Sequence, residues 1–422
     1  MLHLHDIESE WIDARTKGVP GGVSPFQLAD TGKQQWNVLN QDLPLPLLVL
    51  KEVPLEKNLK TLQSYCESNG VDIAPHGKTT MCPQLFQRQL DHGAWGMTVA
   101  TINQMQVYRS VGIQRIILAN QLVGRQAVET VVHYLSDDPE FEFFSIVDSC
   151  ALIEHLAQEL DQAGLKKPLL VLLEIGQEGG RSGCRSLDEA RQVCQALASR
   201  PDLFSLVGFE LFEGVMPTAA KAQQFLDQAV KWIHDLADEI SPTCSEVVLT
   251  AGGSCYFDLV VQTLKSINLS KPRRIVLRSG CYLTHDHGAY EAAQLEGVDR
   301  GHWSSELKPA LELWSYVQSR PEDRLALLTM GKRDCPYDAG MPVVKEIYRP
   351  GTGWMNVDVS AMEVTHLNDQ HGYLKVPKES LIRVGDMVMC GISHPCTAFD
   401  KWKFVLGVDD QYNVVTGYRT FF

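Results

Sequence analysis

The sequence has no excess of positive charge. Its 38 lysines and arginines are outnumbered by 52 aspartates and glutamates, which gives a net charge of −14, and no basic cluster interrupts this balance. A nucleic acid backbone is a dense row of negative charges, so an acidic surface repels it. We therefore expect no nucleic acid partner.

Membrane-directed segments are also missing. A membrane-spanning helix needs about 20 consecutive, mainly apolar residues, and the sequence contains no such run. Residues 1–15 carry histidine, aspartate and glutamate where an export signal has basic residues followed by an apolar run. The sequence thus predicts no membrane partner.

Paired cysteine motifs are absent as well. The eleven cysteines form no Cys-x-x-Cys pair, their number is odd, and Cys66, Cys150 and Cys390 fall inside apolar runs. This usage is typical of reduced, buried thiols and not of a disulfide framework. It favours the cytoplasm as the compartment.

Alternating strand and helix patterns dominate the middle of the 422-residue chain, whose length suits two domains. Alternation predicts a parallel sheet, and eight units predict closure into a (β/α)8 TIM barrel over residues 54–300. A doubly wound open sheet is the alternative, because a count of strands does not prove closure. The expected strands are residues 71–74, 96–100, 115–119, 143–147, 169–175, 206–212, 246–250 and 274–277. The expected helices include residues 54–69, 102–111, 151–163, 187–199, 219–238 and 256–265.

The sequence pattern changes in residues 301–422. Short strands with turn signals and little helical periodicity predict a separate, mainly antiparallel β domain. Residues 1–53 form a leader that ends in a strand at residues 47–53, which the barrel does not need and which we expect to join the β domain. The expected strands of that domain are residues 311–318, 325–330, 343–348, 357–364, 372–376, 387–390 and 404–407.

Lys78 stands where the first barrel strand ends, in the segment Ala74-Pro75-His76-Gly77-Lys78-Thr79-Thr80. Barrels of this kind carry their active sites at the carboxyl ends of the strands. An amine buried there has a lowered pKa, which makes it a nucleophile towards an aldehyde cofactor. The alternative is an ordinary surface lysine.

Glycine-rich loops follow the seventh and eighth strands. They read Thr250-Ala251-Gly252-Gly253-Ser254 and Arg278-Ser279-Gly280-Cys281-Tyr282. Glycine lets backbone N–H groups approach an anion closely, and these two loops bind phosphate in many barrels. Together with Lys78 they favour pyridoxal phosphate, although each loop alone is also compatible with a plain turn.

Two charged residues at neighbouring strand ends are further candidates. Arg181 lies between glycines after the fifth strand, where it can pair with a phenolate or a substrate carboxylate, or simply face solvent. Glu210 lies among apolar residues of the sixth strand, within reach of a pyridine nitrogen. Its alternative is an ion pair with an interior arginine such as Arg278.

The segment Ile392-Ser393-His394-Pro395-Cys396 is a candidate metal site. In an extended segment, residues two apart share a face, so His394 and Cys396 can bind one cation. A thiolate with an imidazole favours zinc, and two protein ligands leave positions for water or substrate. His285, Asp286 and His287 form a second cluster that can equally well only line the eighth-strand loop.

The order of these motifs resembles the D-serine dehydratase and D-threonine aldolase family, which are fold-type III pyridoxal phosphate enzymes related to alanine racemase. The shared elements are Pro-His-x-Lys-Thr, Arg-x-Gly, Gly-Gly-Ser, Gly-x-Tyr, His-Gly and His-x-Cys, found between residues 47 and 402. Three positions depart from the pattern: Ala74 replaces an arginine, Gln370 replaces a glutamate before His371, and Glu210 replaces a tyrosine or glutamine.

The resemblance implies that Lys78 binds pyridoxal 5'-phosphate covalently and takes a proton from the substrate. It also implies that glycine-loop residues hold the phosphate and that His394 and Cys396 hold zinc or another divalent cation. Motifs and resemblance together predict cofactor binding by Lys78, Arg181, Glu210, Thr250, Gly252, Gly253, Ser254, Gly280 and Cys281.

The implied activity is that of a D-serine or D-3-hydroxyamino acid dehydratase, which forms a 2-oxo acid and ammonia from a small D-amino acid. Cysteine after the metal-binding histidine favours this branch over the aldolase branch, which forms glycine and an aldehyde. A non-catalytic pyridoxal phosphate carrier would not need a metal, and a racemase needs a second base. The relationship also implies a homodimer.

Overall fold

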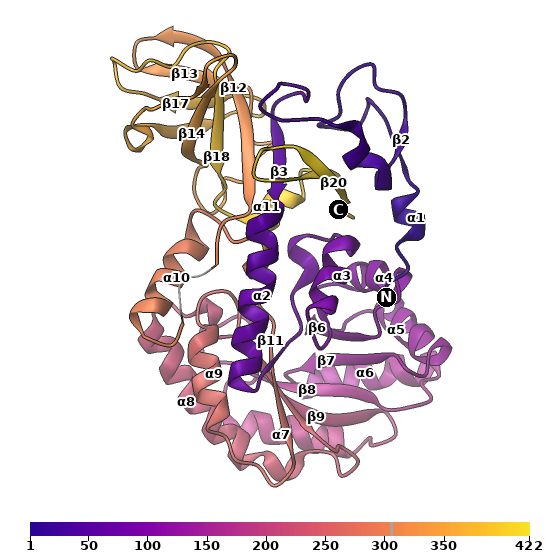
Figure 1. Ribbon diagram of the computed structural model, residues 1–422. Coiled ribbons are helices and arrows are strands. Elements are labelled where there is room, and N and C mark those ends of the chain that lie inside the picture. The colour runs from indigo at the N-terminus through magenta and orange to yellow at the C-terminus, as the bar shows by residue number, and fades with distance from the viewer. Residues whose placement is uncertain (304–306) are drawn as a thin grey trace.

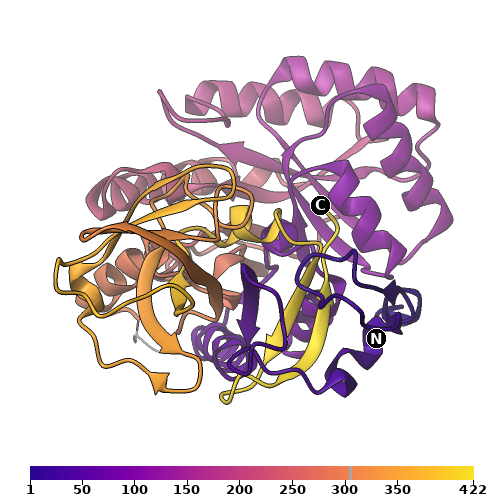
Figure 2. The same cartoon turned by 90° about the horizontal axis from the view of Figure 1, so that it is seen from above.

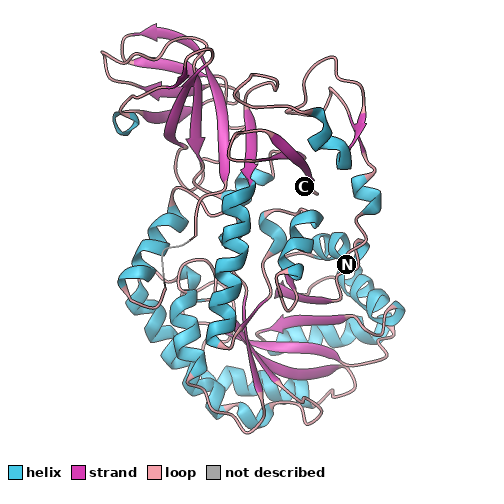
Figure 3. Cartoon of the chain, in the orientation of Figure 1, coloured by secondary structure: helices cyan, strands magenta, loops and turns pink. Residues whose placement is uncertain are grey.

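The computed structural model describes residues 1–303 and 307–422. Residues 304–306, which belong to the predicted β domain of residues 301–422, lie outside the described residues. The chain forms a barrel of strands and helices and a second body made almost entirely of strands (Figures 1 and 3). The amino-terminal part of the chain contributes to the second body, because the strand that precedes the barrel in sequence pairs with strands of that body.

Eight parallel strands form the barrel, as the alternating pattern predicts. They are β4 (Asp72–Ile73), β5 (Met97–Val99), β6 (Arg115–Gln121), β7 (Glu142–Val147), β8 (Leu169–Ile175), β9 (Phe204–Leu211), β10 (Val247–Ala251) and β11 (Arg273–Leu277), in the order β4-β11-β10-β9-β8-β7-β6-β5. The two ends of this sheet meet, because Trp95 N donates to Ile73 O (2.8 Å) and Thr98 N donates to Pro75 O (2.9 Å). The open-sheet alternative is therefore wrong.

Helices cover the outside of the barrel. They are α2 (Glu52–Asn69), α3 (Pro83–Asp91), α4 (Ile102–Ser110), α5 (Arg125–Asp137), α6 (Cys150–Ala163), α7 (Leu187–Ala198), α8 (Ala219–Asp235), α9 (Phe257–Lys265) and α10 (Ala289–Asp299). Four of them, α4, α6, α7 and α8, begin after a serine or threonine whose hydroxyl accepts a backbone N–H of the first turn, the usual start signal of a helix. Helices α3, α5 and α10 were not predicted from the sequence, although α5 buries Val128, Val131, Val132 and Leu135 at helical spacing.

The second body is a mainly antiparallel sheet. Its strands are β12 (Leu311–Glu322), β13 (Leu325–Leu328), β14 (Val343–Arg349), β15 (Gly353–Trp354), β16 (Glu363–Leu367), β17 (Gly372–Lys375), β18 (Met387–Gly391), β19 (Phe404–Val408) and β20 (Val414–Arg419). Strand β3 (Leu47–Lys51) lies between β12 and β19 and is buried at every position. This confirms that the strand before the barrel joins the β domain.

One strand prediction in this domain is wrong and two strands were missed. Residues 357–364 are largely a turn, in which Ser360 N donates to Asp358 Oδ1 (3.0 Å) around the 3-10 segment Val359–Ala361, and the strand β16 begins only at Glu363. Aspartate competes for backbone N–H groups in this way and interrupts a strand. The sequence pattern predicted neither β15, which pairs with β14, nor β20, which pairs with β19.

The leader lies beside β20 (Figure 2). It contains the short elements α1 (His5–Glu8), β1 (Trp11–Ile12), β2 (Phe26–Gln27) and the 3-10 segment Leu28–Gln34. Hydrogen bonds tie it to the second body, since Val38 N donates to Tyr412 O (3.1 Å) and Val414 N donates to Trp36 O (2.8 Å). The leader therefore extends the β domain at its β20 edge.

The eleven cysteines are free. Cys66 and Cys390 are buried, as their apolar surroundings predict, whereas Cys150 is exposed at the first position of α6, so that part of the prediction is wrong. Across residues 1–303 and 307–422, every helix is too short or too polar to cross a membrane.

Candidate active site

Lys78 lies in the 3-10 segment Gly77–Thr79 directly after β4 and lines a cavity of 260 Å³. Gly77 permits this turn, because a Cβ there would lie 2.0 Å from Tyr108 Oη. The Lys78 side chain is exposed in the single chain. The expectation that burial activates this amine is therefore wrong for the isolated subunit, although the amine does face the cavity.

The cavity lies at the carboxyl ends of the barrel strands, where its walls come from the β4, β8, β10 and β11 loops and from the segment after β18. It brings together nine of the predicted residues: Lys78, Arg181, Gly252, Gly253, Ser254, Gly280, Cys281, His394 and Cys396. Glu210 and Thr250 are not among its lining residues. Eight further lining residues were not predicted, among them the polar or aromatic His76, Asn120, Phe212 and Arg278. Of these four, His76 and Arg278 stand inside motifs that the sequence already offered as site segments.

The strand-seven loop is already bound to a carboxylate. Glu213, which is fully buried after β9, accepts hydrogen bonds from Gly252 N (3.1 Å) and Gly253 N (2.9 Å). Ser279 Oγ donates to Gly253 O (2.6 Å) from the opposite side. These two N–H groups, which were predicted from the sequence to bind phosphate, therefore already donate to the Glu213 carboxylate.

The strand-eight loop and Ser254, the last residue of the strand-seven loop, keep their N–H groups free. Within the described part of the chain, the backbone N–H groups of Ser254, Gly280 and Cys281 make no hydrogen bond. Gly280 is required here, because a Cβ at this position would lie 2.3 Å from His76 O. Three free donors near the Lys78 amine can hold the phosphate of pyridoxal phosphate, so the residues present fit this cofactor.

Arg278 stands between the cavity and Glu210. Its guanidinium pairs with the Glu210 carboxylate, and Arg278 Nη1 also donates to Thr250 Oγ1 (2.9 Å). Burial raises the pKa of Glu210 to about 7, against the opposing charge of Arg278. The structure therefore shows the ion pair that was the alternative interpretation of Glu210, and Arg278 is the member of the pair that faces the cavity.

Arg181 is an exposed arginine of the cavity wall. Its guanidinium lies 4.9 Å from the centre of the Phe212 ring, and it forms no ion pair with the described residues. A guanidinium without a carboxylate partner can bind an anionic group of a ligand in two-pronged fashion. His76 lies on the same cavity, and burial, reinforced by the charges of Lys78 and Arg278, lowers the pKa of His76, so its ring is neutral at pH 7.

His394 and Cys396 line the same cavity, but not on an extended segment. His394 directly precedes the short helix α11 (Pro395–Phe399), to which Cys396 belongs. Asp338 accepts hydrogen bonds from His394 Nδ1 (2.6 Å) and Thr397 Oγ1 (2.7 Å). A carboxylate bound to one ring nitrogen leaves the other for a metal, which is the usual setting of a metal-binding histidine.

The His394 imidazole and the Cys396 thiol shift each other's pKa. The contact with Cys396, followed by that with Asp338, raises the pKa of His394 to about 9 even though burial works against it. The neighbouring thiol of Cys281, together with His394, lowers the pKa of Cys396 to about 4. A nitrogen donor beside a thiolate is a donor set that suits zinc. Asp338 was not predicted, because 56 residues separate it from His394 and no local pattern joins the two.

The His285, Asp286 and His287 cluster is structural. Asp286 Oδ1 accepts the N–H groups of Gly288 (2.8 Å) and Tyr290 (3.0 Å) at the start of α10, and His287 N donates to Ile392 O (2.9 Å). These contacts tie the strand-eight loop to the β domain. None of the three residues lines the cavity of Lys78.

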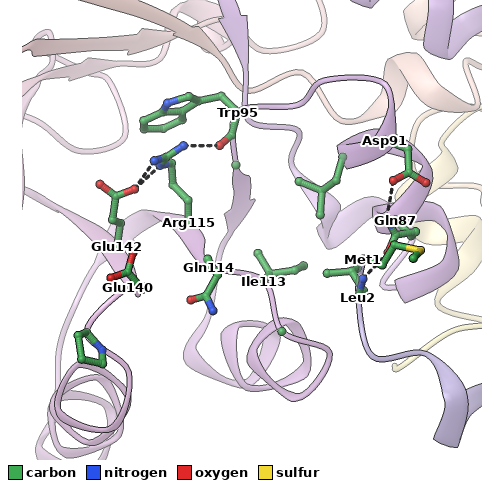
Figure 4. A pocket seen from close by; sticks show the side chains of 14 residues that line it. Met1, Leu2, Gln87, Asp91, Trp95, Ile113, Gln114, Arg115, Glu140 and Glu142 are labelled. Carbon is green, nitrogen blue, oxygen red and sulfur yellow. Dashed lines mark hydrogen bonds and ion pairs between the residues drawn. The ribbon is translucent and has the colours of Figure 1, made fainter.

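A larger cavity of 740 Å³ lies at the other end of the barrel, at the starts of β5, β6 and β7 (Figure 4). Several of its polar groups are paired with one another, since Arg115 pairs with Glu142 and donates to Trp95 O (3.0 Å), and Gln87 donates to Asp91 (2.6 Å). This face of a barrel ordinarily serves stability and not catalysis.

Fold and site together define an alanine racemase-like barrel with an attached β domain and a lysine at the barrel mouth. Residues 53–260 match the model of the alanine racemase N-terminal domain, and residues 310–408 match that of the putative serine dehydratase domain. The chain belongs to the D-serine dehydratase and D-threonine aldolase family of fold-type III pyridoxal phosphate enzymes.

One curated relative is similar in sequence, and two solved structures share the fold. The chain is 25% identical over 341 residues to D-threonine aldolase from Arthrobacter sp., which covers 78% of this chain and 80% of that protein. The crystal structure of D-threonine aldolase from Filomicrobium marinum superposes with a TM-score of 0.71 at 22% identity, over 90% of this chain and 95% of that one. D-threo-3-hydroxyaspartate dehydratase from Delftia sp. HT23 superposes with a TM-score of 0.70 at 17% identity, over 92% and 99%.

Proposed function

We propose that this protein is a pyridoxal phosphate- and zinc-dependent lyase that converts D-serine or a similar small D-3-hydroxyamino acid into a 2-oxo acid and ammonia. One observation carries the proposal: the amine of Lys78, three free N–H donors and the His394–Cys396 pair all line one cavity. An amine, an anion site and a metal-binding pair are the three parts that this reaction needs.

The chain's own residues divide the work as follows. Lys78 Nζ takes the proton from the substrate's Cα, and Arg181 binds the substrate carboxylate, because the Arg278 guanidinium is already bound to Glu210. Asp338 holds the His394 ring in place. When bound, pyridoxal phosphate stabilises negative charge at Cα, and zinc helps the β-hydroxyl to leave.

The size of the cavity favours a small substrate. Its 260 Å³ must hold both the cofactor and the amino acid. Lys78, Arg181 and Arg278 are the lysine and arginine side chains among its lining residues. Each of them already has a role, and His394 would hold the metal, so a second substrate carboxylate would lack a cationic partner. We therefore expect D-serine and D-threonine to be better substrates than a 3-hydroxyaspartate.

D-threonine separates this function from its alternative. A dehydratase forms 2-oxobutyrate and ammonia, whereas the aldolase branch, favoured by the identity to D-threonine aldolase, forms glycine and acetaldehyde. The assay follows all four products with wild-type protein, with protein treated with a chelator and with Lys78→Ala as the inactive control. Glycine and acetaldehyde as the main products would contradict the dehydratase proposal, and activity that survives chelation would remove zinc from it.

We also propose that the protein acts as a homodimer. The exposed Lys78 side chain supports this, because a second copy placed over the cavity mouth would exclude water from the amine. Light scattering during size-exclusion chromatography measures the mass directly. A monomer with full activity would contradict the proposal.

A further inference from the structure

Two cysteines from distant parts of the chain face each other in the candidate site. Cys281 lies in the loop after β11 and Cys396 lies in α11, and their Sγ atoms are 3.8 Å apart. The hydroxyl of Thr79, next to Lys78, lies 3.2 Å from Cys396 Sγ and 3.8 Å from Cys281 Sγ. Both thiols are partly accessible from the cavity.

The separation of the two sulfurs is the one that a shared zinc ion needs. Each Zn–S bond is about 2.3 Å long, so two thiolates on one tetrahedral ion stand about 3.8 Å apart. A disulfide would need the same atoms at about 2.05 Å. The thiols therefore already stand at the distance for a shared ion.

His394 completes the donor set. Asp338 occupies its Nδ1, so Nε2 is the ring nitrogen left for a metal. Within residues 1–303 and 307–422, no three histidine, cysteine, aspartate or glutamate side chains lie close enough together to bind one metal ion as they stand. An arriving ion must therefore draw the imidazole and the two thiols together, which requires side-chain rotation at the cavity wall.

We propose that Cys281 is a third protein ligand of the metal, beside His394 and Cys396. The inference rests on the metal site of the proposed function and adds to it a Cys₂His donor set, which leaves the fourth position of zinc open for the substrate hydroxyl, as catalytic zinc sites do. The ion binds the thiolate forms, so any thiol proton leaves to solvent. Two thiolates also select zinc over magnesium or manganese.

Cys281 then serves two sites at once. Its backbone N–H is one of the three free donors near Lys78, while its side chain reaches the thiol of Cys396. A single residue would thus hold the phosphate by its backbone and the metal by its sulfur. This arrangement places the cofactor and the metal on adjoining sides of one loop.

Cobalt substitution tests the assignment without measuring activity. The protein is stripped with a chelator, dialysed under a reducing agent that does not bind metals, and titrated with Co²⁺, whose thiolate charge-transfer absorption grows with the number of bound sulfurs. We expect Cys281→Ser and Cys396→Ser each to lose about half of the wild-type absorption per bound cobalt. Zinc affinity, measured by competition with a chromogenic chelator, should fall by ~10- to 100-fold or more in Cys281→Ser, since even an outer partner of a ligand contributes this much.

Cys255→Ser is the matched control. Cys255 lies in the neighbouring loop after β10 with similar partial burial, but it does not line the cavity, so this variant should keep the wild-type cobalt spectrum and zinc affinity. Thermal unfolding of each stripped variant shows whether it is folded. If Cys281→Ser does not fold, the cobalt absorption of the wild type can still be compared with that of Cys396→Ser. The ratio of the two gives the number of thiolates that bind the ion in the wild type.

The outcomes separate the inference from the proposed function. A wild type that binds neither cobalt nor zinc ends the metal half of the proposed function and the inference with it. A wild type that binds metal through one thiolate, with Cys281→Ser unchanged, overturns the inference alone. A Cys281–Cys396 disulfide that forms in the metal-loaded protein, detected by intact mass, would overturn it as well.

Discussion

Replacing Gly280 with alanine tests how closely the two halves of the site are joined. Gly280 belongs to the strand-eight loop and touches the backbone just before Lys78, since an added Cβ would lie 2.3 Å from His76 O and 3.1 Å from His76 C. The φ angle of Gly280 is −113°, which an alanine adopts without strain. The effect of this substitution therefore comes from the close approach and not from backbone conformation.

The expected size of the effect follows from that distance. The loops must separate by roughly 1 Å, and overpacking of this kind costs about 1–3 kcal/mol. A domain of this size loses about 2–4 °C of melting temperature per kcal/mol, so we expect a decrease of ~2–12 °C. Displacing one N–H from the phosphate removes about 1.5–3 kcal/mol, so pyridoxal phosphate should bind ~10- to 150-fold more weakly.

The assay compares Gly280→Ala with Gly21→Ala. Gly21 has a negative φ, and no atom lies within 4 Å of an added Cβ, so this control should behave as wild type. Thermal unfolding of the cofactor-free protein gives the melting temperature, and titration followed by absorbance gives the affinity for pyridoxal phosphate. If melting temperature and affinity both stay at the wild-type values, the reasoning about this contact is refuted.

Three further predictions address individual residues. Borohydride reduction should attach the cofactor permanently to the wild type but not to Lys78→Ala, as peptide mass spectrometry would show; a label on another lysine contradicts the assignment. Asp338→Asn should weaken zinc binding by ~10- to 100-fold, because the His394 ring loses its charged partner, whereas Asp161→Asn, which breaks an exposed pair with Arg200, should leave it unchanged. Because burial raises the pKa of Glu210 from 4.5 to about 7, its stabilising contribution is complete below pH 4.5 and is lost as the pH rises through 7. Wild type should thus lose stability relative to Glu210→Gln between pH 6 and pH 8, and equal differences in denaturant midpoint at both pH values would count against this shift.

Local patterns were sufficient to predict most of the fold. Each barrel strand is a short apolar run between turn residues, so its position follows from hydrophobicity, and β8 was predicted with its observed bounds, residues 169–175. Ends were less certain because burial and capping decide them: β9 begins two residues earlier than predicted. Residues 357–364 were wrong because an aspartate side chain binds the backbone there and prevents a strand.

Tertiary contacts decided the roles of the charged residues. Glu213 binds N–H groups 39 residues away, and Glu210 pairs with Arg278 at a distance of 68 residues. No local pattern reports such pairs. The same holds for the exposure of Lys78, which depends on what covers the cavity mouth and not on its neighbours in sequence.

The sequence by itself determined which chemical groups are available: a lysine after the first barrel strand, two glycine loops and a His-x-Cys segment, together with the alternation that forms a barrel. Only the tertiary structure decided which of these groups remain free. Ion pairs and hydrogen bonds form between atoms a few ångströms apart, and the folded chain alone brings Glu213 to the strand-seven loop, Glu210 to Arg278 and Cys281 to Cys396.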